Sequence, residues 1–238
     1  MQRFPAEFSA ALKRGRLRRR AGDVPISHAT ERLRWFPLAL DTDVAVDGIR
    51  LLETHIAQHL RCVRRPINPE TIASMTQAYS EMLPKTTRNA SVILDDPQAE
   101  AYAAAQEIGL IEMLGSRSLH AAAEEVSGFR LCVGPGFQVI RYEHGDYVGP
   151  HNDHHPVEEH LRNGYVDLQI TLTNADVERQ YLIHEFDGWL NRPINVGIQS
   201  GVSISRLPIW HQVTPLVARK GKETKARRWL LLVSFIDR

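Results

Sequence analysis

The chain has 238 residues, of which 43% are hydrophobic and 24% are charged, and its formal net charge is +1. This is the composition of an ordinary globular protein, and its near-neutral charge gives no electrostatic reason to expect nucleic acid or a membrane surface as a partner. No apolar run reaches the ~18 residues of a membrane span. Cys62 and Cys132 are too few for a disulfide scaffold, and we interpret them as buried, reduced thiols of a cytoplasmic protein.

Residues 1–40 form a basic arm and lead-in. Six of the eight residues at positions 13–20 are lysine or arginine. No apolar segment follows them, which excludes a secretory signal. We expect a solvated arm, with an organellar transit peptide or contact with an acidic partner as alternatives.

Residues 41–128 have a helical pattern and are expected to support the rest of the fold. Apolar residues between 46 and 60 recur at spacings of mostly three and four, as on a buried helix face. Capping residues followed by proline predict further helices over 71–83 and 99–114, and a short helix is expected over 118–126.

Residues 129–238 have the pattern of short strands. Turn-forming residues, among them Asn191, Arg192 and Pro193, separate the apolar runs, and no helix of useful length intervenes. The strands should therefore pair antiparallel. The expected fold class is α+β, with a double-stranded β-helix core (jelly roll, cupin-like) preceded by supporting helices. Strands are expected at 137–142, 165–173, 180–186, 202–207 and 228–236.

The tripeptide His151-Asn152-Asp153 carries the first chemical signal. On an extended segment residues two apart point to the same side, so His151 and Asp153 are expected to converge on one metal ion. His211, at the edge of a later strand, is the candidate third ligand. Two histidines and one carboxylate make a facial triad that leaves positions free for a co-substrate and oxygen, which is typical of non-haem iron(II) oxygenases.

A cation at the start of the last strand adds a second signal. A 2-oxoglutarate that chelates the iron has a far carboxylate that requires a buried cationic partner, and a guanidinium can bind it through two hydrogen bonds. Arg227 and Arg228 open the apolar run up to Val233. Adjacent strand residues face opposite sides, so only one of the two arginines can point inward.

Three motifs together resemble the prolyl-4-hydroxylase-like branch of the iron(II)/2-oxoglutarate dioxygenases. They are the stretch from Tyr142 to Asp153, the pair of segments 201–205 and 210–215, and the strand that Arg228 opens. The resemblance covers about residues 129–237. It implies that His151, Asp153 and His211 bind the metal, that Arg228 anchors 2-oxoglutarate, and that Tyr142 donates a hydrogen bond to the co-substrate.

The chain also departs from that family pattern. Residues 177–184 stand where relatives often carry a Gly-Gly-x-Thr-like segment. The strand 165–173 lacks a tyrosine that some relatives use for the far carboxylate, and Gln169 or Thr171 is the expected substitute. Ser234 stands where nucleic-acid dealkylating relatives have a second arginine, which argues against that branch. His184 is interpreted as a core or rim histidine, His154 and His155 as exposed loop residues, and 156–164 as either a lid or a solvated loop.

The expected activity is hydroxylation of an unactivated C–H bond in an amino acid, a peptidyl residue or a small metabolite. The expected cofactors are Fe(II), 2-oxoglutarate and O2, with ascorbate as a supporting reductant. Desaturation, cyclisation or demethylation on the same scaffold is one alternative. A cupin-like metal-binding or sensing protein without oxygenase activity is another.

Overall fold

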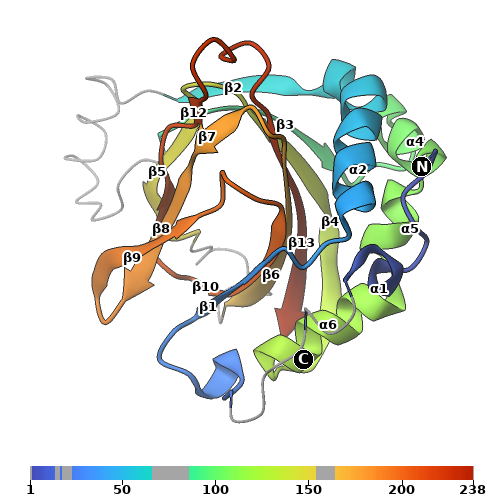
Figure 1. Cartoon of the computed structure of the whole chain (residues 1–238). Coiled ribbons are helices and arrows are strands. Elements are labelled where there is room, and N and C mark those ends of the chain that lie inside the picture. The colour runs from blue at the N-terminus through green and yellow to red at the C-terminus, as the bar shows by residue number, and fades with distance from the viewer. Residues whose placement is uncertain (1, 14–16, 18–22, 66–85, 154–163, 238) are drawn as a thin grey trace, which may run out of the picture.

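The computed structural model describes residues 2–13, 17, 23–65, 86–153 and 164–237. In this part of the chain one antiparallel sheet of eleven strands curls into a barrel, and helices cover one side of it (Figure 1). The α+β class with a jelly-roll core and supporting helices, predicted from the sequence, is confirmed.

The strands follow one continuous order around the barrel. Along the sheet the order is β1-β10-β6-β13-β4-β3-β5-β11-β8-β9, and β2 pairs with β3 off this path. Because β3 pairs with both β4 and β5, it joins the two halves of the barrel. The strands are β1 (Leu33–Pro37), β2 (Arg61–Arg65), β3 (Thr87–Leu94), β4 (Leu131–Tyr142), β5 (Tyr147–His151), β6 (Tyr165–Thr173), β8 (Tyr181–Phe186), β9 (Trp189–Asn195), β10 (Gly201–Leu207), β11 (His211–Val213) and β13 (Arg228–Asp237), and a separate ribbon pairs β7 (Val177–Arg179) with β12 (Val217–Ala218).

Strand alternation gives the sheet an outer face that packs on the helices and an inner face around a cavity. On β13, Trp229, Leu231, Val233 and Phe235 belong to the main hydrophobic core, and all four are fully buried. The residues between them point into the barrel. The apolar run of β13 is thus explained by a strand that is covered on both faces.

Two of the described helices, α2 and α6, begin with a side-chain cap. The Asp41 carboxylate accepts a hydrogen bond from the Asp43 amide at the start of α2, and the Ser116 hydroxyl accepts one from the Leu119 amide at the start of α6. The indole Nε1 of Trp229 donates to Glu53 Oε1 at 2.9 Å and so ties α2 to β13. The helical segments are α1 (Phe8–Ala11), α2 (Thr42–His55), α4 (Glu100–Glu107), α5 (Leu110–Leu114) and α6 (Arg117–Ser127), with 3-10 turns η1 (Ile26–His28) and η2 (Ala57–His59).

The expectation that residues 41–128 are helical is only partly right. Strands β2 and β3 come from this range and pair with each other, and β3 also pairs with β4; β1, in the lead-in before it, pairs with β10. The predicted helix 99–114 is divided into α4 and α5 at Gly109, whose φ of 74° is left-handed. The predicted helix 71–83 lies outside the described residues.

Two further expectations are wrong. Asn191, Arg192 and Pro193 lie within β9 rather than in a turn, and the chain reverses at Asp187 and Gly188 instead. Proline is tolerated there because β9 is the edge strand of the sheet. Cys62 is exposed on β2 and is therefore not a buried thiol.

Candidate metal centre and adjoining cavity

Two histidines face each other across neighbouring strands. His151 ends β5 and His211 begins β11, and the two residues are register partners, with ring centroids 4.1 Å apart. The Nδ1 atom of each ring lies 2.8 Å from a backbone carbonyl two residues earlier in the chain, that of Gly149 and that of Ile209. Nδ1 then carries the proton and donates, which leaves both Nε2 atoms free to bind a metal.

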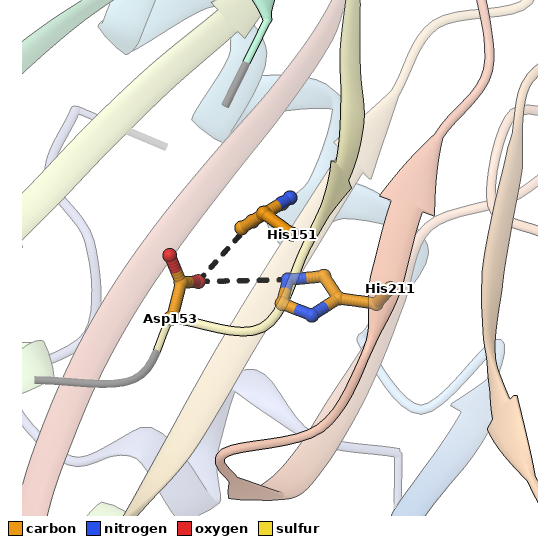
Figure 2. Close-up of side chains that lie close together, drawn as sticks. All are labelled: His151, Asp153 and His211. Atoms are coloured by element: carbon orange, nitrogen blue, oxygen red, sulfur yellow. Dashed lines mark ion pairs between the residues drawn. The ribbon is translucent and has the colours of Figure 1, made fainter. Parts of the chain in front are cut away.

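Asp153 meets both histidines. Its Oδ2 lies 3.2 Å from Nε2 of His151 and 3.6 Å from Nε2 of His211, and Figure 2 shows the three side chains converging. The three ligand atoms lie within 4.8 Å of one another. The structure therefore brings together the three residues that the sequence pattern selected.

The convergence does not arise in the way the alternation of an extended strand predicts. β5 ends at His151, and Asp153 has a left-handed φ of 49°. The Tyr165 hydroxyl donates to the Asp153 backbone carbonyl at 3.2 Å and helps to hold this turn. A kinked strand end, rather than a continuous strand, aims the carboxylate at the histidines.

Chemically, the cluster is a two-histidine, one-carboxylate set. It offers three ligands on one side of an ion and lacks the sulfur ligands common in structural zinc sites. The fixed tautomers and the carbonyl partners of both imidazoles are what a metal-binding histidine requires. The donor set fits iron(II).

Arg228 is the inward member of the arginine pair. It is 2% exposed, and one face of its guanidinium lies over the ring of Tyr142, 4.3 Å from the centroid. Arg227 instead points outward, with ion pairs to Glu53 and Glu143. Burial lowers the pKa of Arg228 because the charged form is desolvated there.

The buried guanidinium has a donor to spare. Its Nε donates to Oε1 of Gln180 at 2.6 Å, whereas Nη2 has no hydrogen-bond partner among the described residues. An unpaired buried cationic donor is costly and indicates a place for an anion. The far carboxylate of 2-oxoglutarate fits this requirement.

Gln180 was not selected from the sequence. Its Nε2 also donates to the carbonyls of Asp146 and Thr214, at 3.1 and 2.9 Å, so one amide joins three segments around Arg228. Gln180 begins the predicted strand 180–186, within the segment where the family motif is missing. A single buried glutamine leaves no periodic pattern in the sequence by which its role could be recognised.

Tyr142 is buried at the end of β4 and lines the cavity. Burial raises the pKa of its phenol, and the nearby Arg228 opposes the shift. The phenol stays neutral and can donate a hydrogen bond. Asn89 and Thr87, bonded to each other on β3, lie on the same wall and were missed because their segment was expected to be helical.

A cavity of about 1030 Å³ adjoins the three metal-binding candidates. Its walls combine apolar side chains with polar ones; Arg228 is not among the lining residues, but its guanidinium contacts the ring of Tyr142, which is. The inner face of β6 contributes Asp167 and Gln169, and the Asp167 carboxylate accepts from the Ser234 hydroxyl at 2.7 Å. A volume of this size holds a co-substrate and a drug-sized organic molecule.

The remaining sequence candidates are distributed as follows. Gln169 reaches the cavity, and Thr171 is buried two residues further along the same face of β6. His184 is 1% exposed, its Nδ1 lies 3.1 Å from the Glu185 carbonyl, and burial lowers its pKa, in agreement with its interpretation as a core residue. His154, His155 and most of 156–164 lie outside the described residues.

Comparisons with known proteins identify the fold. No family model and no curated protein matches the sequence. Among solved structures, the non-haem α-ketoglutarate-dependent carbocyclase SnoK of nogalamycin biosynthesis aligns with a TM-score of 0.58 and 13% identity over 96% of this chain and 85% of its own. The epimerase SnoN of the same pathway aligns with a TM-score of 0.56 and 13% identity over 89% and 80%.

A prolyl hydroxylase from Trichoplax adhaerens, solved with a peptide of hypoxia inducible factor, aligns with a TM-score of 0.51 and 12% identity over 87% of this chain and 84% of its own. The chain therefore has the double-stranded β-helix fold of the iron(II)/2-oxoglutarate oxygenases. The three similar structures differ in reaction, so the fold alone leaves the reaction open.

Among the described helices none is long and apolar enough to cross a membrane.

Proposed function

We propose that this protein is an iron(II)- and 2-oxoglutarate-dependent oxygenase. The observation that carries the proposal is the occurrence, in one barrel, of the His151–Asp153–His211 cluster and of a buried Arg228 whose Nη2 has no hydrogen-bond partner among the described residues. A metal-binding or sensing protein of the same fold has use for the cluster alone. A buried guanidinium with a spare donor is explained by a co-substrate that carries a second carboxylate.

Each side chain has a distinct task in this proposal. His151, Asp153 and His211 hold the iron, with the two imidazoles oriented by the Gly149 and Ile209 carbonyls. Arg228, fixed by Gln180, binds the far carboxylate of 2-oxoglutarate. Tyr142 donates a hydrogen bond to the co-substrate, since its raised pKa keeps the phenol protonated.

When bound, iron(II) with 2-oxoglutarate and O2 supplies the oxidising chemistry, in which 2-oxoglutarate is converted to succinate and carbon dioxide. The barrel orients the substrate beside the metal and limits the access of water. We propose hydroxylation of a C–H bond as the reaction, with ascorbate as a supporting reductant. The substrate class is a small molecule or a peptidyl residue, and SnoK and SnoN support the first, whereas the prolyl hydroxylase supports the second.

The test is spectroscopic and anaerobic. Addition of iron(II) and 2-oxoglutarate to the protein should give a weak visible charge-transfer band, and His151→Ala should abolish it. His28→Ala, which alters an exposed histidine of η1, is the matched control and should keep the band. Absence of the band in the wild-type protein, together with thermal stability unchanged by a chelator, would overturn the proposal.

A further inference from the structure

Strand β2 presents two arginines to the cavity. Arg61, Val63 and Arg65 line it, whereas Cys62 and Arg64 alternate with them and do not. The register of β2 on β3 places Arg61 beside Ser91 and Arg65 beside Thr87. Residues four apart on a strand are about 13 Å apart along the backbone, so the two long side chains extend from different points of one wall.

In the part of the chain that the structure describes, neither of these two cations is paired with a carboxylate. Both arginines are exposed on β2, and neither makes an ion pair or a side-chain hydrogen bond with a described residue. Two carboxylates outside the metal cluster line the same cavity. Asp167 accepts from Ser234 on the inner face of β6, and Glu100 is exposed in the first turn of α4. The β2 wall is therefore positively charged and available to a ligand.

The co-substrate does not account for these charges. Arg228, on β13, already supplies the partner for the far carboxylate of 2-oxoglutarate under the proposed function. β2 is off the main path of the barrel and is attached to it through β3. A cavity of about 1030 Å³ has room for a second organic molecule that reaches this wall.

We propose that Arg61 and Arg65 bind an anionic group, carboxylate or phosphate, of the organic substrate. The assignment of this anion to the substrate rests on the proposed function, but the anion site itself can be tested without turnover. Guanidinium groups bind both kinds of anion through paired hydrogen bonds, and the charge also raises the rate of encounter with an anionic molecule.

The first experiment measures binding by fluorescence titration of the full chain, anaerobic and loaded with iron(II) and 2-oxoglutarate. The probes are 8-anilinonaphthalene-1-sulfonate and its neutral counterpart N-phenyl-1-naphthylamine. The double variant Arg61→Gln/Arg65→Gln should bind the sulfonate probe about tenfold more weakly and the neutral probe unchanged. Arg64→Gln, on the opposite face of the same strand, is the matched control and should change neither.

Three results would overturn the inference. They are an unchanged affinity of the double variant for the sulfonate, an equal loss for both probes, and a wild-type protein that does not prefer the charged probe. Because Arg61, Arg64 and Arg65 are all exposed, the variants should fold, and an unchanged melting temperature checks this.

The second experiment measures succinate release with organic compounds of matched carbon skeleton that end in a carboxylate, a phosphate, an amide or an amine. The acids should stimulate release, and the double variant should raise their KM with little change in kcat. Comparison of succinate release with the carboxylates and with the phosphates shows which of the two anions the site prefers. Stimulation by the amides or amines as strong as that by the acids would overturn the inference.

The two proposals fail in different ways. A missing charge-transfer band and no succinate release with any compound would refute the oxygenase, and the fluorescence titration would still decide on the anion site. A normal band combined with turnover of neutral compounds would refute the anionic substrate alone.

Discussion

The Nε of Arg228 donates a 2.6 Å hydrogen bond to Oε1 of Gln180, and both side chains are buried. The bond crosses from the first residue of β13 to the junction of β7 and β8. It fixes one edge of the guanidinium and leaves Nη2 without a partner among the described residues. The orientation of the proposed co-substrate anchor is thus set by a neutral amide, which does not compete with the co-substrate for the charge.

Replacement of the anchor should weaken 2-oxoglutarate binding and leave metal binding intact. Arg228→Lys keeps the charge but loses the fixed pair of donors, so the Kd of 2-oxoglutarate should rise on the order of 100-fold, about 3 kcal/mol. Titration of the charge-transfer band measures this. Arg227→Gln, one residue earlier and facing outward, should leave the Kd unchanged. An unaltered Kd in Arg228→Lys would show that the carboxylate binds elsewhere.

Removal of the Gln180 amide should destabilise the fold. Gln180→Leu leaves the Arg228 Nε and the carbonyls of Asp146 and Thr214 without their partner, at a cost of about 2–4 kcal/mol. Urea unfolding of the metal-free protein gives the free energy of unfolding. Gln98→Leu, at an exposed position, should change it by less than about 0.5 kcal/mol. Equal effects of the two substitutions would contradict the role of the buried amide.

Stability should fall at mildly acidic pH through His184. Burial lowers its pKa below the ordinary 6.5, so the unfolded chain takes up a proton more readily than the folded one. The contribution of neutral His184 to the free energy of unfolding is fully present above about pH 6.5, the pKa in the unfolded chain. It is lost as the pH falls towards the lower pKa of the folded state. Urea unfolding gives the free energy of unfolding of the metal-free wild type and of His184→Gln at pH 8 and at pH 5.5. As the pH falls, the wild type should lose more of this free energy than the variant. In His28→Gln, at an exposed position, the difference from the wild type should stay constant with pH.

A methyl group at Gly201 should disturb the pairing of β1 with β10. A Cβ there would lie 2.7 Å from the Phe36 carbonyl oxygen and 2.6 Å from the Trp35 ring. The backbone carbonyl of a paired strand cannot move aside as the end of a flexible side chain can. Gly201→Ala should therefore lower the free energy of unfolding by about 1–3 kcal/mol, measured as a lower urea midpoint at unchanged slope. Gly188→Ala has no atom within 4 Å of the new Cβ and tests the backbone effect of a turn glycine alone. Because Gly188 has a left-handed φ of 80° and Gly201 does not, backbone strain is confined to the control, and an unchanged urea midpoint in Gly201→Ala would contradict the close contact.

Five strands of the second half, β4, β6, β8, β10 and β13, could be predicted because their burial follows their local pattern. β6 occupies the predicted range 165–173, and β13 differs from the prediction by one residue. β2 and β3 were missed because their range was expected to be helical, and because several of their cavity-lining residues are polar or charged. Arg61, Asn89 and Thr87 therefore entered the cavity wall without any sequence signal.

The sequence by itself determined the residue types of the site and their order along the chain, since imidazole, carboxylate and guanidinium have few other uses in that arrangement. It could not determine how they meet. Only the tertiary structure decided that Arg228 rather than Arg227 points inward, because this depends on which face of the last strand packs against the helices. It also decided that a left-handed turn at Asp153 aims the carboxylate, and that Gln180 holds Arg228. These contacts join segments between about 30 and 60 residues apart, and only the pairing of strands brings such segments within hydrogen-bond distance.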